Sequence, residues 1–206
     1  MLALKPDDYD FVSNFDTVWA VVLGAFLATI GGFIATQVEA YFEHRRRERN
    51  AALFFGEVLS TLRILLNFAA DTKKVGDPYG PVTMRMLRSA RREIDIYERN
   101  RESLYDLRDG EMRARIHTLV LRIGMPIDGI FDSTTELDAA KRRILEGNTG
   151  LEERTDLEQR MAQLSEAREN GFEFLMSIAA KLEELSRDLE PLAGHSFERV
   201  NEVANR

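Results

Sequence analysis

The pattern of hydrophobic and polar positions divides the chain into one long apolar stretch and a series of amphipathic segments. The apolar stretch is Thr17–Val38, which runs for 22 residues without an ionisable side chain. At about 1.5 Å of helical rise per residue it spans about 33 Å, enough to cross the hydrocarbon core of a bilayer. We predict a transmembrane helix at residues 17–38, preceded by a short extracytoplasmic segment at residues 1–16.

The helix that crosses the membrane is expected to continue far beyond it. Between Glu39 and Asp71 there is no proline, and Gly56 is the only glycine. Apolar residues recur here at intervals of three and four, which predicts a stripe that faces other helices. The stripe consists of Phe55, Leu59, Leu62, Leu66 and Ala69. Two glycines and two prolines at residues 75–81 (VGDPYGP) then end the helix.

Three further amphipathic helices are predicted after this turn. The first covers Met84 to about Tyr97 and is followed by a break at residues 100–109. The second starts near Asp109, a good N-cap, and passes Pro126, where we expect a kink and no domain boundary. It ends at residues 147–150 (GNTG). The last runs from about Leu151 to Glu190, ahead of Pro191, with near-heptad leucine spacing.

These elements predict an all-α fold in which one N-terminal transmembrane helix continues into a helical bundle. The bundle occupies residues 39–190 and contains about four long helices, followed by a polar C-terminal tail at residues 191–206. The tail has little periodicity and is either a frayed helix or a docking peptide. The alternative to a bundle is an extended coiled coil with a second chain, because the last helix carries a long apolar seam.

Charges beside the apolar stretch predict its orientation. Only Lys5 accompanies the four aspartates that precede the stretch, whereas four arginines follow it closely: Arg45, Arg46, Arg47 and Arg49. An excess of basic residues marks the cytoplasmic side, so the N-terminus is expected outside and the C-terminal domain in the cytoplasm. These arginines also raise the alternative of binding to anionic lipid. Such recognition usually needs a denser basic cluster, so we favour a role in topology.

Small residues recur every fourth position within the apolar stretch: Ala20, Gly24, Ala28, Gly32 and Thr36. Small side chains at this spacing let a second helix approach closely, so we predict a packing face. The simpler interpretation is that Gly and Ala are common in membrane helices. The partner is expected to be the bilayer together with either another membrane protein or a second copy of this chain.

Composition excludes several classes of function. The 206 residues are 44% hydrophobic and 31% charged, as in a folded, helix-rich chain. A net charge of −7 argues against a nucleic-acid partner. With no Cys and three separated His, the chain offers no thiol chemistry, and we expect no metal, cofactor or catalytic site. The sequence contains no phosphate-binding loop or nucleophile elbow, so no small-molecule substrate is indicated.

Three carboxylates at intervals of four residues form the one cluster of possible binding groups: Asp128, Asp132 and Glu136. They lie on one face of the predicted helix, near Pro126. Carboxylates at this spacing bind a hard cation or meet an arginine patch in some proteins. Like charges four residues apart more often belong to a solvated face, which is the interpretation we favour.

The order of these segments resembles a diffuse group of bacterial single-pass membrane proteins. The resemblance rests on an apolar span, the basic stretch at residues 43–49 (EHRRRER), and a pattern formed by Tyr97, Asn100, Leu104 and Leu107 ahead of a long helix. It covers most of the chain as a layout. The resemblance implies placement in the bacterial inner membrane and carries no agreed activity.

Taken together, these patterns favour a non-enzymatic structural or accessory subunit. Its transmembrane helix would dock on a membrane protein complex, and its cytoplasmic bundle on a partner. The alternative is a single-pass signalling or regulatory protein that acts as a homo-oligomer. Against it, about 15 outer residues are too few to fold a sensor domain. A lipid-directed enzyme would need a nucleophile or base that the sequence does not supply.

Overall fold

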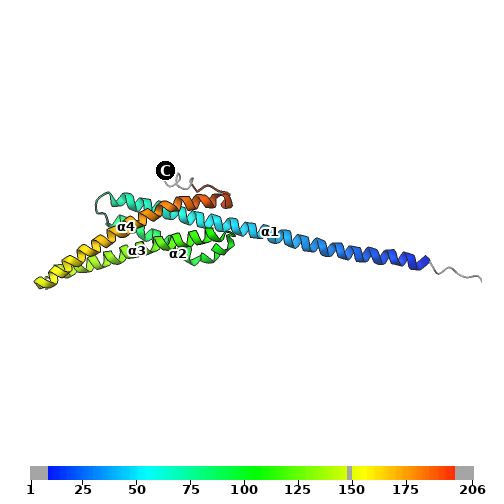
Figure 1. Cartoon of the computed structure of the whole chain (residues 1–206), viewed down its shortest axis with the longest axis horizontal. Helices are drawn as coiled ribbons and strands as arrows, with labels where there is room; N and C mark the ends of the chain where they lie inside the picture. The colour runs from blue at the N-terminus through cyan, green and yellow to red at the C-terminus, as the bar shows by residue number, and fades with distance from the viewer. Residues whose placement is uncertain (1–8, 148–149, 198–206) are drawn as a thin grey trace, which may run out of the picture. The chain divides into compact units, whose positions relative to one another are not determined.

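The computed structural model describes residues 9–147 and 150–197, which contain helices and no strand. The elements in chain order are α1 (Tyr9–Lys73), α2 (Pro81–Arg99), the 3-10 helix η1 (Arg101–Asp106), α3 (Gly110–Leu145) and α4 (Leu151–Ala193) (Figure 1). The predicted all-α class is therefore confirmed. The outermost parts of the predicted terminal segments, residues 1–8 and 198–206, lie outside the described residues.

The chain forms two units, Met1–Arg46 and Arg47–Arg206, and α1 runs through both. In the N-terminal unit, every side chain from Val18 to Glu39 is exposed. This part of α1 is long and apolar enough to cross a membrane. The helix begins at Tyr9, well before the predicted span, so part of the predicted outer segment is also helical.

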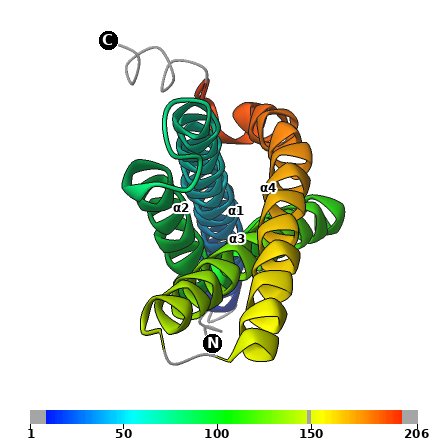
Figure 2. The same ribbon diagram turned by 90° about the vertical axis from the view of Figure 1, so that its left-hand side faces the viewer.

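The C-terminal unit is a bundle of four helices, formed by residues 47–73 of α1 together with α2, α3 and α4. In the view along the bundle, α2 and α4 lie on opposite sides of α1 (Figure 2). The α1–α4 contact includes an ion pair of 3.0 Å between Arg63 and Glu183. On the other side of α1, the rings of Phe55 and Tyr97 of α2 meet edge to face at 5.8 Å.

The predicted apolar stripes form the core of this bundle. All five residues of the α1 stripe, from Phe55 to Ala69, are completely buried. They pack with the buried faces of α2, α3 and α4, to which Leu87, Ile123 and Leu182 belong. Burial of each large apolar side chain stabilises the fold by roughly 1.5–3 kcal/mol, so this shared core holds the four helices in one unit.

Local sequence signals set the helix boundaries of the bundle. The turn after α1 contains Gly76, whose φ of 81° favours glycine, and α2 starts with Pro81 at its first position. The predicted N-cap of α3 is confirmed, because the Asp109 carboxylate accepts hydrogen bonds from the N–H groups of Glu111 and Met112. The predicted break at residues 100–109 is also confirmed and contains η1.

The two helix-internal prolines do not divide the bundle. As predicted, Pro126 creates no domain boundary, and α3 continues through it to Leu145. The prediction that the last helix ends at Glu190 is wrong, since α4 includes Pro191 and ends at Ala193. Proline near the end of a helix removes only one backbone hydrogen bond of the last turn. Gly194 then ends the helix with a φ of 64° and donates to Glu190 O at 2.8 Å.

The first residues of the predicted tail dock on the bundle. Phe197 is 2% exposed, and its backbone N–H donates to the Glu190 carboxylate at 2.7 Å. Its ring lies on α1 where Gly56 provides space: a Cβ atom at Gly56 would lie only 2.0 Å from the ring. Two alternatives were predicted for the tail, and residues 194–197 agree with the docking peptide.

The α3–α4 hairpin extends past the ends of α1 and α2 (Figure 1). Lys73, the last residue of α1, forms an ion pair with Glu169 of α4. The part of α4 from Leu151 to Arg168 therefore extends past the end of α1. In the extension, α3 and α4 pack through buried Leu137 and Leu164. Exposed ion pairs, such as Arg160 with Glu136 at 2.8 Å, join the two helices from outside.

Candidate functional site

The predicted packing face on α1 contacts no other segment among the described residues of its unit. The residues of this face are all exposed: Ala20, Gly24, Ala28, Gly32 and Thr36. A Cβ atom added at Gly24 or Gly32 would meet nothing within 4 Å. The Thr36 hydroxyl donates to the carbonyl of Gly32 at 2.9 Å, so even this polar group is satisfied within the helix. The face thus offers a smooth, uncharged surface for a second helix.

The four arginines of the predicted basic cluster divide between two environments. Arg45 and Arg46 belong to the N-terminal unit and are exposed. Arg49 belongs to the bundle, where its Nε donates to the carbonyl of Ala193 at 3.0 Å. A cation at the C-terminal end of a helix interacts favourably with the helix dipole. Arg49 therefore holds the end of α4 against α1, a structural role that its sequence position did not reveal.

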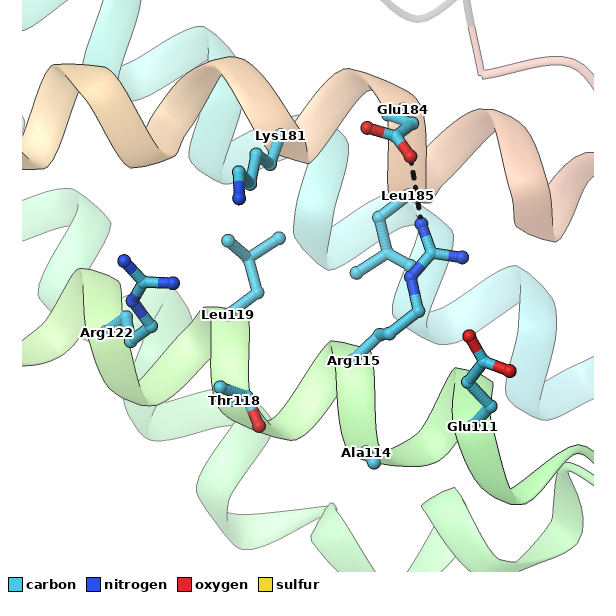
Figure 3. A pocket seen from close by; sticks show the side chains of 9 residues that line it. All are labelled: Glu111, Ala114, Arg115, Thr118, Leu119, Arg122, Lys181, Glu184 and Leu185. Atoms are coloured by element: carbon cyan, nitrogen blue, oxygen red, sulfur yellow. Dashed lines mark hydrogen bonds and ion pairs between the residues drawn. The ribbon is translucent and has the colours of Figure 1, made fainter.

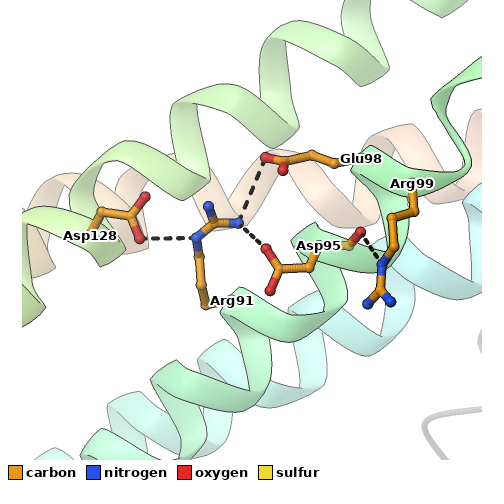
Figure 4. A network of polar contacts seen from close by, with 5 residues as sticks. All are labelled: Arg91, Asp95, Glu98, Arg99 and Asp128. Carbon is orange, nitrogen blue, oxygen red and sulfur yellow. Dashed lines mark hydrogen bonds and ion pairs between the residues drawn. The ribbon is translucent and has the colours of Figure 1, made fainter.

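Two of the three predicted acidic residues meet arginines of neighbouring helices. Asp128 accepts from Arg91 Nε at 2.9 Å, and Glu136 pairs with Arg160. Arg91 also contacts Asp95 at 2.7 Å, so α2 and α3 share a network of charges (Figure 4). Among the described residues, no group of three or more His, Cys, Asp or Glu is placed to hold a metal ion. All three carboxylates are exposed, as the favoured interpretation of a solvated face predicted, and two of them also pair with arginines.

A second polar cluster joins the C-terminal end of α1 and the turn after it to α4. The Tyr79 hydroxyl donates to the Glu169 carboxylate at 2.9 Å, and Lys73 is the other partner of that carboxylate. Hydrogen bonding from Lys73 lowers the pKa of Glu169, whereas burial is the main cause that raises the pKa of Tyr79. The Arg168 guanidinium lies 3.9 Å from the centre of the Tyr79 ring. These contacts fix the α1–α2 turn against α4.

Two of the three histidines contact aromatic side chains of the bundle. His117 Nδ1 lies 3.0 Å from the Tyr97 hydroxyl, inside the contact between α2 and α3. Burial raises the pKa of Tyr97 to about 12, so its hydroxyl keeps its proton at ordinary pH. The His195 ring packs at 5.8 Å on that of Phe197 in the docked tail. His44 is exposed on α1.

An open groove lies between α3 and α4 (Figure 3). Its volume is about 400 Å³, within the usual range of binding sites. The buried side chains of Leu119 and Leu185 form the apolar floor. Seven more residues surround this floor: Glu111, Ala114, Arg115, Thr118, Arg122, Lys181 and Glu184.

The two ends of the groove differ in charge balance. At one end, Arg115 pairs with Glu184 at 3.2 Å and with Asp188 at 2.8 Å, so its charge is compensated. At the other end, Arg122 and Lys181 extend on either side of Leu119 (Figure 3). Neither forms an ion pair with a carboxylate within the described part of the chain, although Arg122 lies 5.8 Å above the Phe174 ring. This end of the groove therefore carries two uncompensated positive charges beside an apolar floor.

No known protein family, curated protein or solved structure matches this chain. The function must therefore be argued from the surfaces described above.

Sequence reasoning missed the groove because its residues come from two different helices. Periodicity does not specify how two helices are aligned along each other. Arg122 and Lys181 are 59 positions apart in the sequence and appear there as ordinary surface charges. One signal was present: each lies three residues from an apolar core position, Leu119 and Ile178, on the edge of its helix. That spacing is common to many surface residues, so it does not single out these two.

Proposed function

We propose that this protein is a non-enzymatic accessory subunit of a membrane protein complex in the bacterial inner membrane. The continuity of α1 carries the proposal: one helix supplies both an exposed apolar stretch and the central helix of a charged bundle. Such a helix couples whatever its apolar part binds to whatever its bundle binds. The arginines from Arg45 to Arg49 favour an orientation with the N-terminus outside and the bundle in the cytoplasm.

The apolar part of α1 would dock on a helix of the complex through its small-residue face. Within a bilayer, association depends on close packing because lipid removes the hydrophobic drive. The open surfaces at Gly24 and Gly32 would allow the backbones of two helices to come close. The bundle would then project a partner-binding surface into the cytoplasm.

A regulatory homo-oligomer is the second candidate, and the same continuity of α1 favours it. A shift of the helix in the membrane would be passed on to the bundle without an intervening loop. The two candidates differ in what binds the small-residue face: another protein, or a second copy of this chain.

The size of the native assembly after extraction in a mild detergent tests the proposal. Replacing both Gly24 and Gly32 by Leu adds bulk to the small-residue face and should release the protein from its complex. The matched control is Leu23→Phe with Ile30→Phe, which adds bulk away from that face. We expect the control to migrate with the large assembly in a native gel. An unchanged assembly in the glycine variant would remove the small-residue face from the account.

A further inference from the structure

The α3–α4 groove has the composition of a docking site for an acidic helix. Its floor, Leu119 and Leu185, is apolar, and apolar side chains remain exposed next to its basic end. Met125 is 73% exposed and follows Arg122 by three residues on α3, while Phe174 is 48% exposed beside the Arg122 guanidinium. Exposed apolar side chains gathered beside a groove mark an interaction surface more often than isolated ones do.

The charges of the groove select the partner. Arg122 and Lys181 lie without a carboxylate partner in the described residues of a chain whose net charge is −7. An acidic segment would be attracted to this end of the groove. Electrostatic complementarity of this kind fixes where and in which register a partner docks.

A second copy of the chain does not suit this surface. In a twofold dimer only residues near the axis meet their own copies, so two copies joined at the basic end of the groove would bring Arg122 and Lys181 of each close together. Like charges brought together in this way oppose association. A helical partner with carboxylates on the flank of an apolar stripe meets both requirements of the groove: its apolar residues cover Leu119 and Leu185, and its carboxylates reach the two cations.

We propose that this groove binds an amphipathic, acidic helix of another protein in the cytoplasm. The proposal rests on the accessory function above, since it identifies the bundle surface through which the subunit holds its second partner. Arg122 and Lys181 pair with carboxylates of that helix, and the leucine floor receives its apolar side chains.

Binding of two synthetic peptides to the full-length protein in nanodiscs of neutral lipid tests this assignment. The peptides share one helical apolar stripe and differ only in the flanking residues, which are Glu in one and Lys in the other. We expect the Glu peptide to bind at least about ten times more tightly than the Lys peptide. Combined Arg122→Gln and Lys181→Gln substitutions should weaken the binding of the Glu peptide by a similar factor. Empty nanodiscs measure adsorption of the peptides to lipid.

The matched control carries Arg85→Gln and Arg88→Gln, which remove the same charge from exposed positions on α2. It should bind the Glu peptide like the native chain. Equal binding of the two peptides, or unchanged binding after loss of Arg122 and Lys181, would overturn the assignment. Two further results would also overturn it: the Glu peptide fails to bind at about 1 mM, or it binds empty nanodiscs as well as it binds nanodiscs that contain the protein. Because purified protein is used, the result is independent of the native-assembly test of the accessory function.

Discussion

The contact between Gly56 and Phe197 leads to a specific prediction. Adding one methyl group at Gly56 should destabilise the native chain but stabilise a chain that lacks the Phe197 ring. A Cβ atom at Gly56 would lie 2.0 Å from the Phe197 ring, far inside normal contact distance. Gly56→Ala must therefore displace the ring from its buried site. Displacement exposes the ring to water and releases the tail from α1.

The magnitude follows from two opposing contributions. Loss of a buried Phe side chain costs roughly 1.5–3 kcal/mol. Replacing Gly by Ala inside a helix gains about 1 kcal/mol from backbone propensity. Gly56→Ala should thus lower the free energy of unfolding by about 0.5–2 kcal/mol in the native chain. In a Phe197→Ala background the clash no longer exists, so the same substitution should raise it by about 1 kcal/mol.

The assay is urea unfolding of the full-length chain in detergent, followed by far-ultraviolet circular dichroism and compared as a double-mutant cycle. Gly129→Ala is the matched control, because Gly129 lies in α3 and a Cβ atom there meets nothing within 4 Å. It should stabilise both backgrounds equally. If Gly56→Ala stabilises the native chain, or acts equally in both backgrounds, Phe197 does not occupy the site above Gly56.

Three further substitutions test contacts of the bundle. Arg91→Ala should cost about 1 kcal/mol in urea unfolding, because it leaves a cluster of carboxylates without a cation, whereas exposed Arg85→Ala should change stability by less than about 0.5 kcal/mol. Asp109→Ala removes the cap of α3 and should cost about 1 kcal/mol, with Asp109→Asn close to native; equal losses would contradict a capping role. The Lys73 hydrogen bond lowers the pKa of Glu169, so its contribution is present above the ordinary value of 4.5 and is lost as pH falls through the lowered value. Urea midpoints measured against pH should fall less steeply in acid for Glu169→Gln than for the native chain, and parallel curves would refute the linkage.

Hydrophobic periodicity was sufficient to predict the helices of the bundle and their buried faces. The spacing from Phe55 to Ala69 predicted a stripe, and all of its residues are buried. Asp109 was predicted as a cap from residue type and position alone, and it accepts two backbone hydrogen bonds. These features depend on neighbours within one or two turns, which the sequence displays directly.

Contacts between distant segments were beyond such reasoning. Gly56 stood out only as the single glycine between Glu39 and Asp71, yet its missing side chain makes room for Phe197. Arg49 was assigned to topology, but it binds the last turn of α4. The same limit applies to the groove, where Arg122 and Lys181 come together only through the packing of α3 on α4. Periodicity predicts which face of a helix is buried and leaves open which residues of another helix it meets.

The central claim is that this chain is one subunit of a larger membrane assembly. Native mass measurement of the tagged protein, extracted at its natural level in a mild detergent, tests it most directly. The account predicts that the protein is recovered in a fixed ratio with at least one different membrane protein. Recovery of this chain alone, as a monomer or as a homo-oligomer of defined size, would contradict the account and favour the regulatory alternative.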